Sequence, residues 1–140
     1  MFDNNPALTA AKAFTADNSA VSRALAVVGD FLASANCGAD AEAKLAIVVE
    51  ELVANLIEHG NCPHDSEIEL ELTALGADIG VTICDAGTAF DPRAFDSDAH
   101  LPPERGGGAG IALVKAWASI AGYESGNGRN ILRLVIREHD

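Results

Sequence analysis

The hydrophobic period of the chain changes near residue 60, and this change constrains the fold more than any other feature. Before it, apolar residues recur at helical spacing, at Leu45, Val48, Val49, Leu52 and Leu56. After it, apolar residues alternate with polar ones, as in a strand that buries one face: Ile68, Leu70 and Leu72 between Glu67, Glu69, Glu71 and Thr73. The sequence therefore predicts helices packed on one face of a sheet.

The segments on either side of this change give the expected order of elements. The sequence predicts strands at 8–14, 67–73, 79–85, 123–125 and 130–137, and helices at 17–35, 40–60 and 108–121. Residues 86–107 are expected to form a long loop, of a kind that is usually a functional lid or a disordered segment. Helices in this order do not alternate with parallel strands. We therefore expect an α+β two-layer sandwich, whose mixed and mostly antiparallel sheet carries its helices on one face.

Two details of the helices also follow from the sequence. Asp40 is expected to cap the second helix. The first helix is expected to bury the apolar residues that recur along it: Val21, Leu25, Val28 and Leu32.

Length, charge and cysteine content limit the class of protein. At 140 residues, the chain is expected to form one domain, 1–140. Its formal charge of −12 argues against unaided binding to nucleic acid or to an anionic membrane, because both require lysine and arginine to replace counterions. Cys37, Cys62 and Cys84 form no CxxC pair and no zinc spacing, so we expect free thiols in a reducing cytoplasm. No signal peptide and no membrane span is predicted.

Glu51, Asn55 and His59 lie four residues apart and therefore share one face of the second predicted helix. The amide oxygen of Asn55 is a hard ligand suited to Mg²⁺. Glu51, one turn earlier, could take the proton from an attacking hydroxyl group or water. The alternative is that Glu51 is a solvated helix residue. His59 either orients this end of the site or simply covers the end of the helix.

Asp85 follows the predicted strand and begins a turn that runs to Pro92. A carboxylate at this place can accept a hydrogen bond from the exocyclic amine of adenine, which guanine lacks at that position. Gly87 removes a side chain where the base must approach the backbone. Phe90 adds an apolar anchor, and Pro92 adds a fixed bend. The alternative is an ordinary Asp-x-Gly turn without a ligand.

A glycine run opens the last predicted helix and could hold phosphate groups. Its backbone N–H groups can turn towards one point beside the positive end of the helix, at Gly106, Gly107, Gly108, Ala109, Gly110 and Ile111. The run is not a Walker A loop, since no Lys-Ser/Thr follows, and it is not a dinucleotide fingerprint. Glycine-rich segments are also common linkers. Arg105 either contacts a terminal phosphate or is an exposed arginine of the lid.

Together these motifs resemble the GHKL ATPase superfamily, which includes gyrase, heat-shock chaperones, mismatch-repair proteins and histidine kinases. Residues 51–59 are similar to its N-box, residues 85–92 to its first glycine box, and residues 108–114 to its second. The small size, the Glu four residues before the Asn and the Phe-Asp-Pro ending most resemble the anti-sigma-factor serine/threonine kinase family of bacterial partner switches. The resemblance covers about residues 8–137.

The resemblance implies a Bergerat fold that binds ATP and Mg²⁺, with a lid at about residues 91–107. Asn55 would hold Mg²⁺, Asp85 would read adenine, and the glycine run would hold the phosphates. Glu51 would activate a serine of a small anti-sigma-factor antagonist protein. The protein would also bind a sigma factor, often as a homodimer.

Two positions depart from the family pattern. The last box usually begins with Gly-Thr or Gly-Ser, whose hydroxyl helps to bind adenine through water, whereas this chain has Gly128-Arg129-Asn130. The N-box carries Leu52 where a small residue is common. Neither change removes a central ligand.

Two functions therefore stay open. The first is an ATP-dependent protein serine kinase that also sequesters a regulator, because Glu51 precedes Asn55 by one turn. The second is a nucleotide-dependent protein-binding module that transfers nothing, as the altered last box and the long loop suggest. The catalytic half of a histidine kinase is disfavoured, because no helix with a phospho-accepting histidine precedes residue 40.

Overall fold

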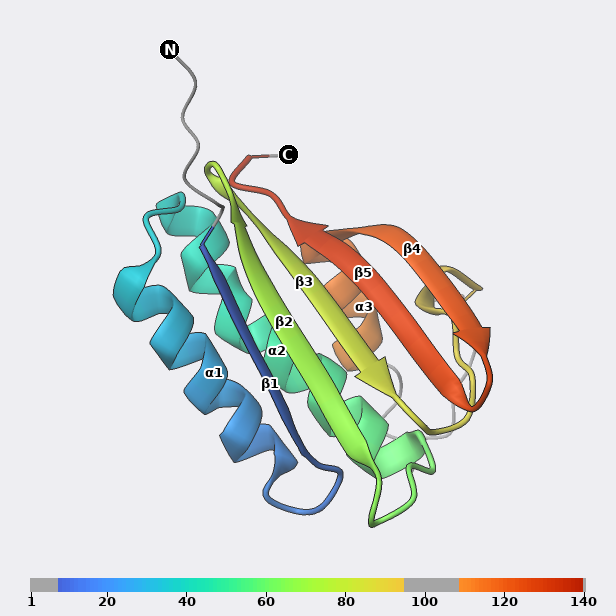
Figure 1. The fold of residues 1–140 in the computed structure, drawn as a ribbon. Helices are drawn as coiled ribbons and strands as arrows, with labels where there is room; N and C mark the ends of the chain where they lie inside the picture. The colour runs from blue at the N-terminus through green and yellow to red at the C-terminus, as the bar shows by residue number, and fades with distance from the viewer. Residues whose placement is uncertain (1–7, 95–108, 140) are drawn as a thin grey trace.

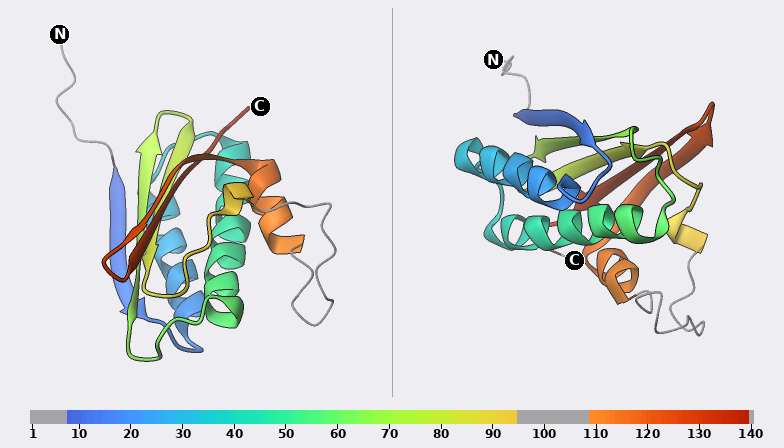
Figure 2. Two further views of the ribbon diagram at one scale, coloured as in Figure 1. Left: turned by 90° about the vertical axis from the view of Figure 1, so that its right-hand side faces the viewer. Right: turned by 90° about the horizontal axis from the view of Figure 1, so that it is seen from below.

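Five strands and three helices form two layers in the computed structural model, which describes residues 8–94 and 109–139. The strands are β1 Thr9–Thr15, β2 Glu67–Leu75, β3 Asp78–Asp85, β4 Ala118–Gly126 and β5 Arg129–Ile136. They lie in the order β1-β2-β3-β5-β4, and every neighbouring pair is antiparallel (Figure 1). The helices, α1 Ala20–Ser34, α2 Ala39–His59 and α3 Ala109–Trp117, all cover the same face of the sheet (Figure 2). The predicted α+β two-layer sandwich is confirmed.

The core lies between the two layers and fixes α2 over the sheet. Cross-strand pairing aligns Leu70 with Ile83 and Ile83 with Leu132, which places buried apolar side chains in rows across three strands. Phe31 of α1 and Leu45 of α2 are fully buried in the same core. Burying one such side chain contributes about 1.5–3 kcal/mol relative to its exposure. The same packing holds the polar side of α2 in a fixed position.

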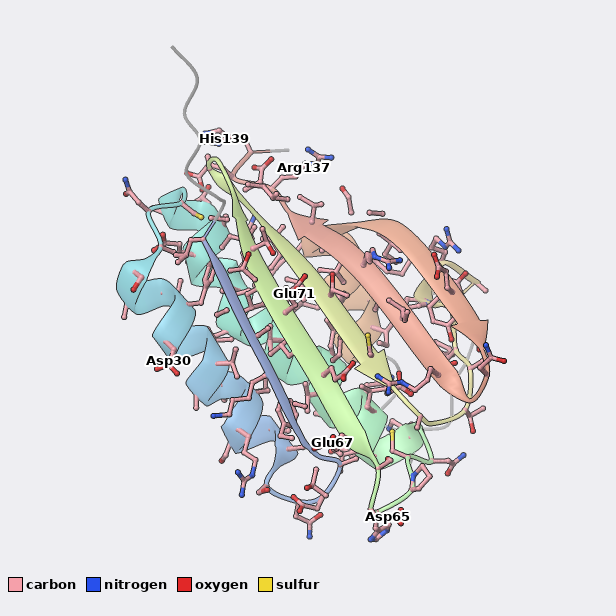
Figure 3. The ribbon with its side chains drawn as sticks, in the orientation of Figure 1. Asp30, Asp65, Glu67, Glu71, Arg137 and His139 are labelled. Carbon is pink, nitrogen blue, oxygen red and sulfur yellow. The ribbon has the colours of Figure 1, made fainter. Side chains whose placement is uncertain are left out.

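Among the residues that the structure describes, no helix covers the other face of the sheet, which is acidic along β2, as the alternation there predicts. Glu67, Glu69 and Glu71 are exposed, and Figure 3 shows Glu67 and Glu71 on this open face. Arg129 of β5 forms an ion pair with Glu69 at 2.7 Å. Exposed pairs of this kind contribute about 0–1 kcal/mol, so the pair adds little to stability.

The chain crosses over between β3 and β4. Both strands are antiparallel to β5, which lies between them, so β3 and β4 run in the same direction. The connection includes a short 3₁₀ helix, η1 Pro92–Ala94, and then α3, which packs against α2. Within the described ranges, no helix combines the length and the apolar character that crossing a membrane requires.

The predicted boundary between α3 and β4 was wrong. The helix ends at Trp117 instead of continuing to residue 121, and β4 begins at Ala118. Pairing with β5 supplies backbone hydrogen bonds from the Ala118–Ile136 pair onwards, and it lets Ile120 and Tyr123 pack against the core. Strand pairing therefore prevails over the helical spacing of residues 118–121.

The predicted buried side of α1 was only partly correct. Val28 is buried, but Val21, Leu25 and Leu32 are only partly buried, and of these three Val21 and Leu32 pack at the edge of the core. The helix instead faces the core with a different set: Ala20, Ala24, Val27, Val28 and Phe31. The apolar stripe is wider than the contact, so its spacing does not identify the centre of the buried side.

The start of α2 is capped by a residue from the other end of the chain. The helix begins at Ala39, so Asp40 lies within the first turn and is not the cap, contrary to the prediction. The Glu138 carboxylate accepts the backbone N–H of Ala41 at 2.9 Å. Gly38 leaves room for this carboxylate, because a Cβ at that residue would collide with it. A negative charge is also favourable at the positive end of a helix.

Candidate functional site

A cavity of about 480 Å³ lies among α2, the end of β3, the first residues of α3 and the last two strands. Its apolar lining includes Leu52, Leu56, Ile83, Ile111 and Leu132. Its polar lining includes Asn55, His59, Asn61, Asp85 and Thr88. A mainly apolar cavity with a few polar groups is the usual form of a small-molecule site.

The structure brings four of the predicted site residues to this cavity: Asn55, Asp85, Phe90 and Ile111. Ala109 and Gly110 begin α3. Arg105, Gly106, Gly107 and Gly108 lie outside the described residues. Glu51 and Gly87 lie nearby but do not line the cavity, and their positions are described below.

Asp85 is one of two polar side chains that are buried among the described residues, and Asn130 is the other. The Oδ1 atom of Asp85 accepts a hydrogen bond from the Gly87 N–H at 2.8 Å and another from Asn130 Nδ2 at 3.0 Å. No described residue donates to Oδ2. Since Asp85 lines the cavity, Oδ2 is available to a hydrogen-bond donor within it.

In the sequence, Asn130 is only a departure from the family pattern, but in the structure its side chain holds Asp85 in place. Its Nδ2 also donates to Gly87 O at 2.9 Å, and its Oδ1 accepts from Ser125 Oγ at 2.6 Å. One signal was present in the sequence. Asn130 is the first member of the inward-facing series in β5 that continues as Leu132, Leu134 and Ile136, and a polar residue at an inward position requires partners.

The turn after Asp85 packs against the end of α2. Thr88 N–H donates to Gly60 O at 2.7 Å. A Cβ on Gly87 would collide with the same carbonyl and would lie 3.0 Å from Cys62 Sγ. The absent side chain of Gly87 therefore lets two backbone segments approach closely. The predicted contact between Gly87 and a base stays a prediction.

Burial raises the pKa of the Cys62 thiol, and the charge of Asp85 raises it further. Hydrogen bonds from the backbone N–H groups of Ala86 and Gly87 oppose this rise in pKa. The pKa of Cys62 therefore depends on the turn that Asp85 begins.

Tyr123 is a second residue of the site that sequence reasoning missed. Its hydroxyl oxygen accepts the backbone N–H of Phe90 at 2.8 Å, and both residues line the cavity. This bond fixes the chain where it leaves the turn. The extended β4 explains the omission, because the predicted strand began only at Tyr123 and gave no reason to place its ring at the site.

On α2, Glu51 and Asn55 are half-buried, and no described residue forms a hydrogen bond with the side chain of Glu51. Asn55 lines the cavity, and no described residue forms a hydrogen bond with its side chain. The Glu51 carboxylate lies against α3, because a Cβ on Gly110 would collide with Oε2. His59 is exposed at the end of the helix, 3.7 Å from Glu58, and also lines the cavity.

A cation at this place would depend on oxygen ligands from outside the protein. Among the described residues, no three His, Cys, Asp or Glu side chains gather as a metal site. Asn55 offers one amide oxygen to the cavity. Mg²⁺ is usually held in this way, by one or two protein oxygens together with phosphate oxygens and water. The residues present therefore fit Mg²⁺ that arrives with a phosphate ligand.

Comparison with known proteins adds a family assignment to this geometry. A family model described as "Histidine kinase-like ATPase domain" matches residues 14–136. No curated protein matches the chain. Among the solved structures, eight chains match.

One of these structures is the crystal structure of the RsbU and RsbW domains of Rv1364c from Mycobacterium tuberculosis. It is similar with a TM-score of 0.60 and 18% sequence identity, over 94% of this chain and 33% of that one. The chain thus spans about a third of the length of that protein, and at this identity the likeness concerns the fold.

Proposed function

Since the chain belongs to the histidine kinase-like ATPase domain family, and thus to the GHKL superfamily, we propose that it binds ATP and transfers the terminal phosphoryl group to a serine of a partner protein. The observation that carries this proposal is the arrangement around one cavity. Asp85 and Asn55 both line the cavity, and Glu51 lies one turn before Asn55, beside the start of α3.

In this proposal, the Asp85 side of the cavity binds adenine. Oδ2 of the carboxylate accepts a hydrogen bond from the exocyclic amine of the base. Ile83 and Leu132 supply apolar surface for the ring, and both line the cavity. A buried acceptor that requires a donor discriminates strongly against a ligand that lacks it.

The Asn55 side handles the phosphates. Asn55 would hold Mg²⁺, which would neutralise phosphate charge when it is bound. Such neutralisation matters in a chain with a formal charge of −12. The glycine run before α3 would add backbone N–H groups, and Arg105 would contact the terminal phosphate.

Glu51 acts as the general base. Its carboxylate takes the proton of the serine hydroxyl while the serine oxygen forms a bond to the terminal phosphorus, and ADP leaves with the electrons of the broken P–O bond. A positioned base contributes about 10²–10⁴-fold to such a step.

We further propose that the serine belongs to a small anti-sigma-factor antagonist protein, and that a sigma factor or similar regulator is a second partner. The likeness in fold to a structure that contains an RsbW domain supports this choice of partners. A homodimer is compatible with the proposal.

Glu51→Gln tests the base. We expect it to reduce phosphoryl transfer about 10²–10⁴-fold and to leave ATP affinity unchanged, because the amide cannot take the proton. Affinity is measured by calorimetry with Mg²⁺ and ATP, and transfer by phosphoprotein formed on a serine-containing antagonist domain. Glu50→Gln is the matched control, since Glu50 is exposed on the same helix and undergoes the same charge change. Equal transfer by Glu51→Gln and Glu50→Gln would remove Glu51 from this role.

One observation favours a second function, a nucleotide-dependent protein-binding module without transfer. Glu51 is not among the residues that line the cavity, and Gly110 of α3 stands directly beside its carboxylate. In this case, ATP would order the site and promote binding to a partner. Tight binding of ATP with no phosphoprotein formed from any antagonist domain would favour this function.

A further inference from the structure

We propose that Asn130 is a positioning residue that sets the preference of the cavity for adenine over guanine. The inference rests on the proposed ATP site and concerns how Asp85 is held there. In this role, Asn130 acts through Asp85 and does not itself contact the base.

The strand register places Asn130 between two partners. It lies opposite Asp85 of β3 and opposite Ser125 of β4. Side chains directly opposite each other in a sheet are close enough to interact. A row of three polar residues thus crosses β4, β5 and β3 next to the cavity.

The hydrogen bonds of Asn130 determine the orientation of its amide. Nδ2 donates to Asp85 Oδ1 at 3.0 Å and to Gly87 O at 2.9 Å, whereas Oδ1 accepts from Ser125 Oγ at 2.6 Å. Exchanging the amide O and N would point an acceptor at two other acceptors. Asn130 is 4% exposed, so water cannot readily replace these partners.

This arrangement gives the two oxygens of Asp85 different tasks. Oδ1 is occupied by Asn130 and by the Gly87 N–H, so the carboxylate cannot rotate without breaking both hydrogen bonds. Oδ2 is therefore kept as an acceptor towards the cavity. The amine of adenine donates a hydrogen bond to this acceptor. Guanine has a carbonyl oxygen at the same position, which has no proton to donate to Oδ2.

An amide at position 130 also holds the turn. A hydroxyl in its place could donate one hydrogen bond only, whereas Asn130 donates one to the carboxylate and one to Gly87 O. The direction of Oδ2 and the position of the turn are therefore coupled through a single side chain.

The experiment measures the affinities of ATP and GTP, each with Mg²⁺, by calorimetry on the wild-type chain and on Asn130→Ala, Asn130→Thr, Ser125→Ala and Asp85→Asn. Wild type is expected to prefer ATP. Asn130→Ala should weaken ATP binding by about 5- to 150-fold, because it removes the side-chain donor to Gly87 O and leaves Asp85 Oδ1 with the Gly87 N–H alone. It should reduce the ratio of ATP to GTP affinity by a similar factor. A loss of packing alone would weaken both nucleotides equally and leave the ratio unchanged.

Variants that remove fewer hydrogen bonds test the proposal without relying on Asn130→Ala alone. Asn130→Thr retains one donor and should restore part of the ratio. Ser125→Ala should reduce the ratio by about 2- to 10-fold, since it removes only the bond that orients Asn130. Ser119→Ala is the matched control, because Ser119 is exposed on the same strand and its hydroxyl makes no hydrogen bond with a described residue. Thermal unfolding followed by circular dichroism identifies any variant that does not fold.

The outcomes separate the two proposals. If the wild-type chain binds neither nucleotide, the proposed function fails. If wild type prefers ATP and Asp85→Asn loses the preference, but the Asn130 and Ser125 variants keep it, Asn130 has no positioning role and this inference is overturned. Should Asn130→Ala not fold, Asn130→Thr and Ser125→Ala decide in the same way.

Discussion

The two sides of the cavity are built differently. On the side that we propose for adenine, Asp85 lines the cavity, and Gly87 and Asn130 stand behind it. There the protein binds its own polar groups: Oδ1 of Asp85 has two donors, and both N–H groups of the Asn130 amide are used. On the side that we propose for the phosphates, Asn55 lines the cavity and Glu51 lies nearby against Gly110. No described residue forms a hydrogen bond with the side chain of Glu51 or of Asn55. On the first side the protein thus fixes every one of these groups except Asp85 Oδ2, whereas on the second side both polar side chains are left for ligands.

This difference separates groups that are fixed before a ligand binds from groups that are free to bind it. Groups that are fixed before binding lose little freedom when the ligand arrives, so they favour affinity and specificity. Groups that stay free can bind a cation, phosphates and a second protein in turn. We therefore expect substitutions on the adenine side to affect folding and nucleotide binding together. Substitutions on the phosphate side should affect transfer and leave the fold intact.

A matched pair of glycine substitutions tests this division, and Gly87→Ala is expected to have the larger effect. Its new Cβ would collide with the backbone carbonyl of Gly60, which cannot move by a simple side-chain rotation. We expect the free energy of unfolding to fall by about 1–3 kcal/mol, as for other overpacked sites. ATP affinity should fall as well, because the turn carries Asp85. Urea unfolding and calorimetry measure the two effects.

The control for Gly87→Ala is Gly122→Ala, because a Cβ on Gly122 would meet nothing within 4 Å. If Gly87→Ala were as stable as this control and bound ATP as the wild-type chain does, the adenine side would not be a fixed unit.

Gly110→Ala should leave the fold intact and reduce transfer. Here the new Cβ would meet the end of the Glu51 side chain, which can rotate away. Stability should stay level or rise by up to about 1 kcal/mol, because alanine favours a helix. We expect phosphoryl transfer to fall by about 10-fold or more, since a displaced base is no longer positioned. ATP affinity should change much less.

Gly29→Ala serves as the control for Gly110→Ala, since Gly29 is also helical and a Cβ there would meet nothing within 4 Å. Loss of ATP affinity without loss of transfer would contradict the assignment of Glu51 to the phosphate side.

The smallest expected effect concerns thiol reactivity. Burial and then Asp85 raise the pKa of Cys62, so at pH 8 less thiolate is present in the folded chain than in the unfolded chain. Alkylation by iodoacetamide should therefore be slower in the folded chain and should accelerate as the pH rises towards the raised pKa. Mass spectrometry of the labelled peptides measures each rate.

Nucleotide binding should slow alkylation of Cys62 severalfold, because it holds the turn against this thiol. Cys37 serves as the internal control: burial raises its pKa as well, but it lies at the other end of α2. Equal protection of both cysteines by ATP would indicate a general stiffening of the fold instead of a local effect.

The sequence predicts those parts of the fold in which buried residues recur at a regular spacing. The alternation in β2 and β3 is confirmed, and so is the apolar stripe of α2 except at Leu56, which is only partly buried near the end of the helix. The predicted start of β4 was wrong, because Ala118 and Gly122 have no strong strand preference. Pairing with β5, which sequence spacing does not reveal, determines their structure.

The site divides in the same way. Asn55, Asp85, Phe90 and Ile111 were identified by motif, and they meet at one cavity. The link between Asp85 and Asn130 joins residues 45 positions apart, so it depends on the strand register and could not be predicted from local spacing. The ligand roles of all predicted site residues stay predictions, including those of Arg105, Gly106, Gly107 and Gly108, which lie outside the described residues.

The cap on α2 has a practical consequence for anyone who labels or immobilises this protein. Glu138 binds the first turn of the helix that carries Glu51 and Asn55, across 97 residues of sequence. A reporter attached directly behind Glu138 would compete with that contact and loosen the helix from its far end. A flexible Gly/Ser spacer between Glu138 and the reporter would leave the carboxylate free to stay in place.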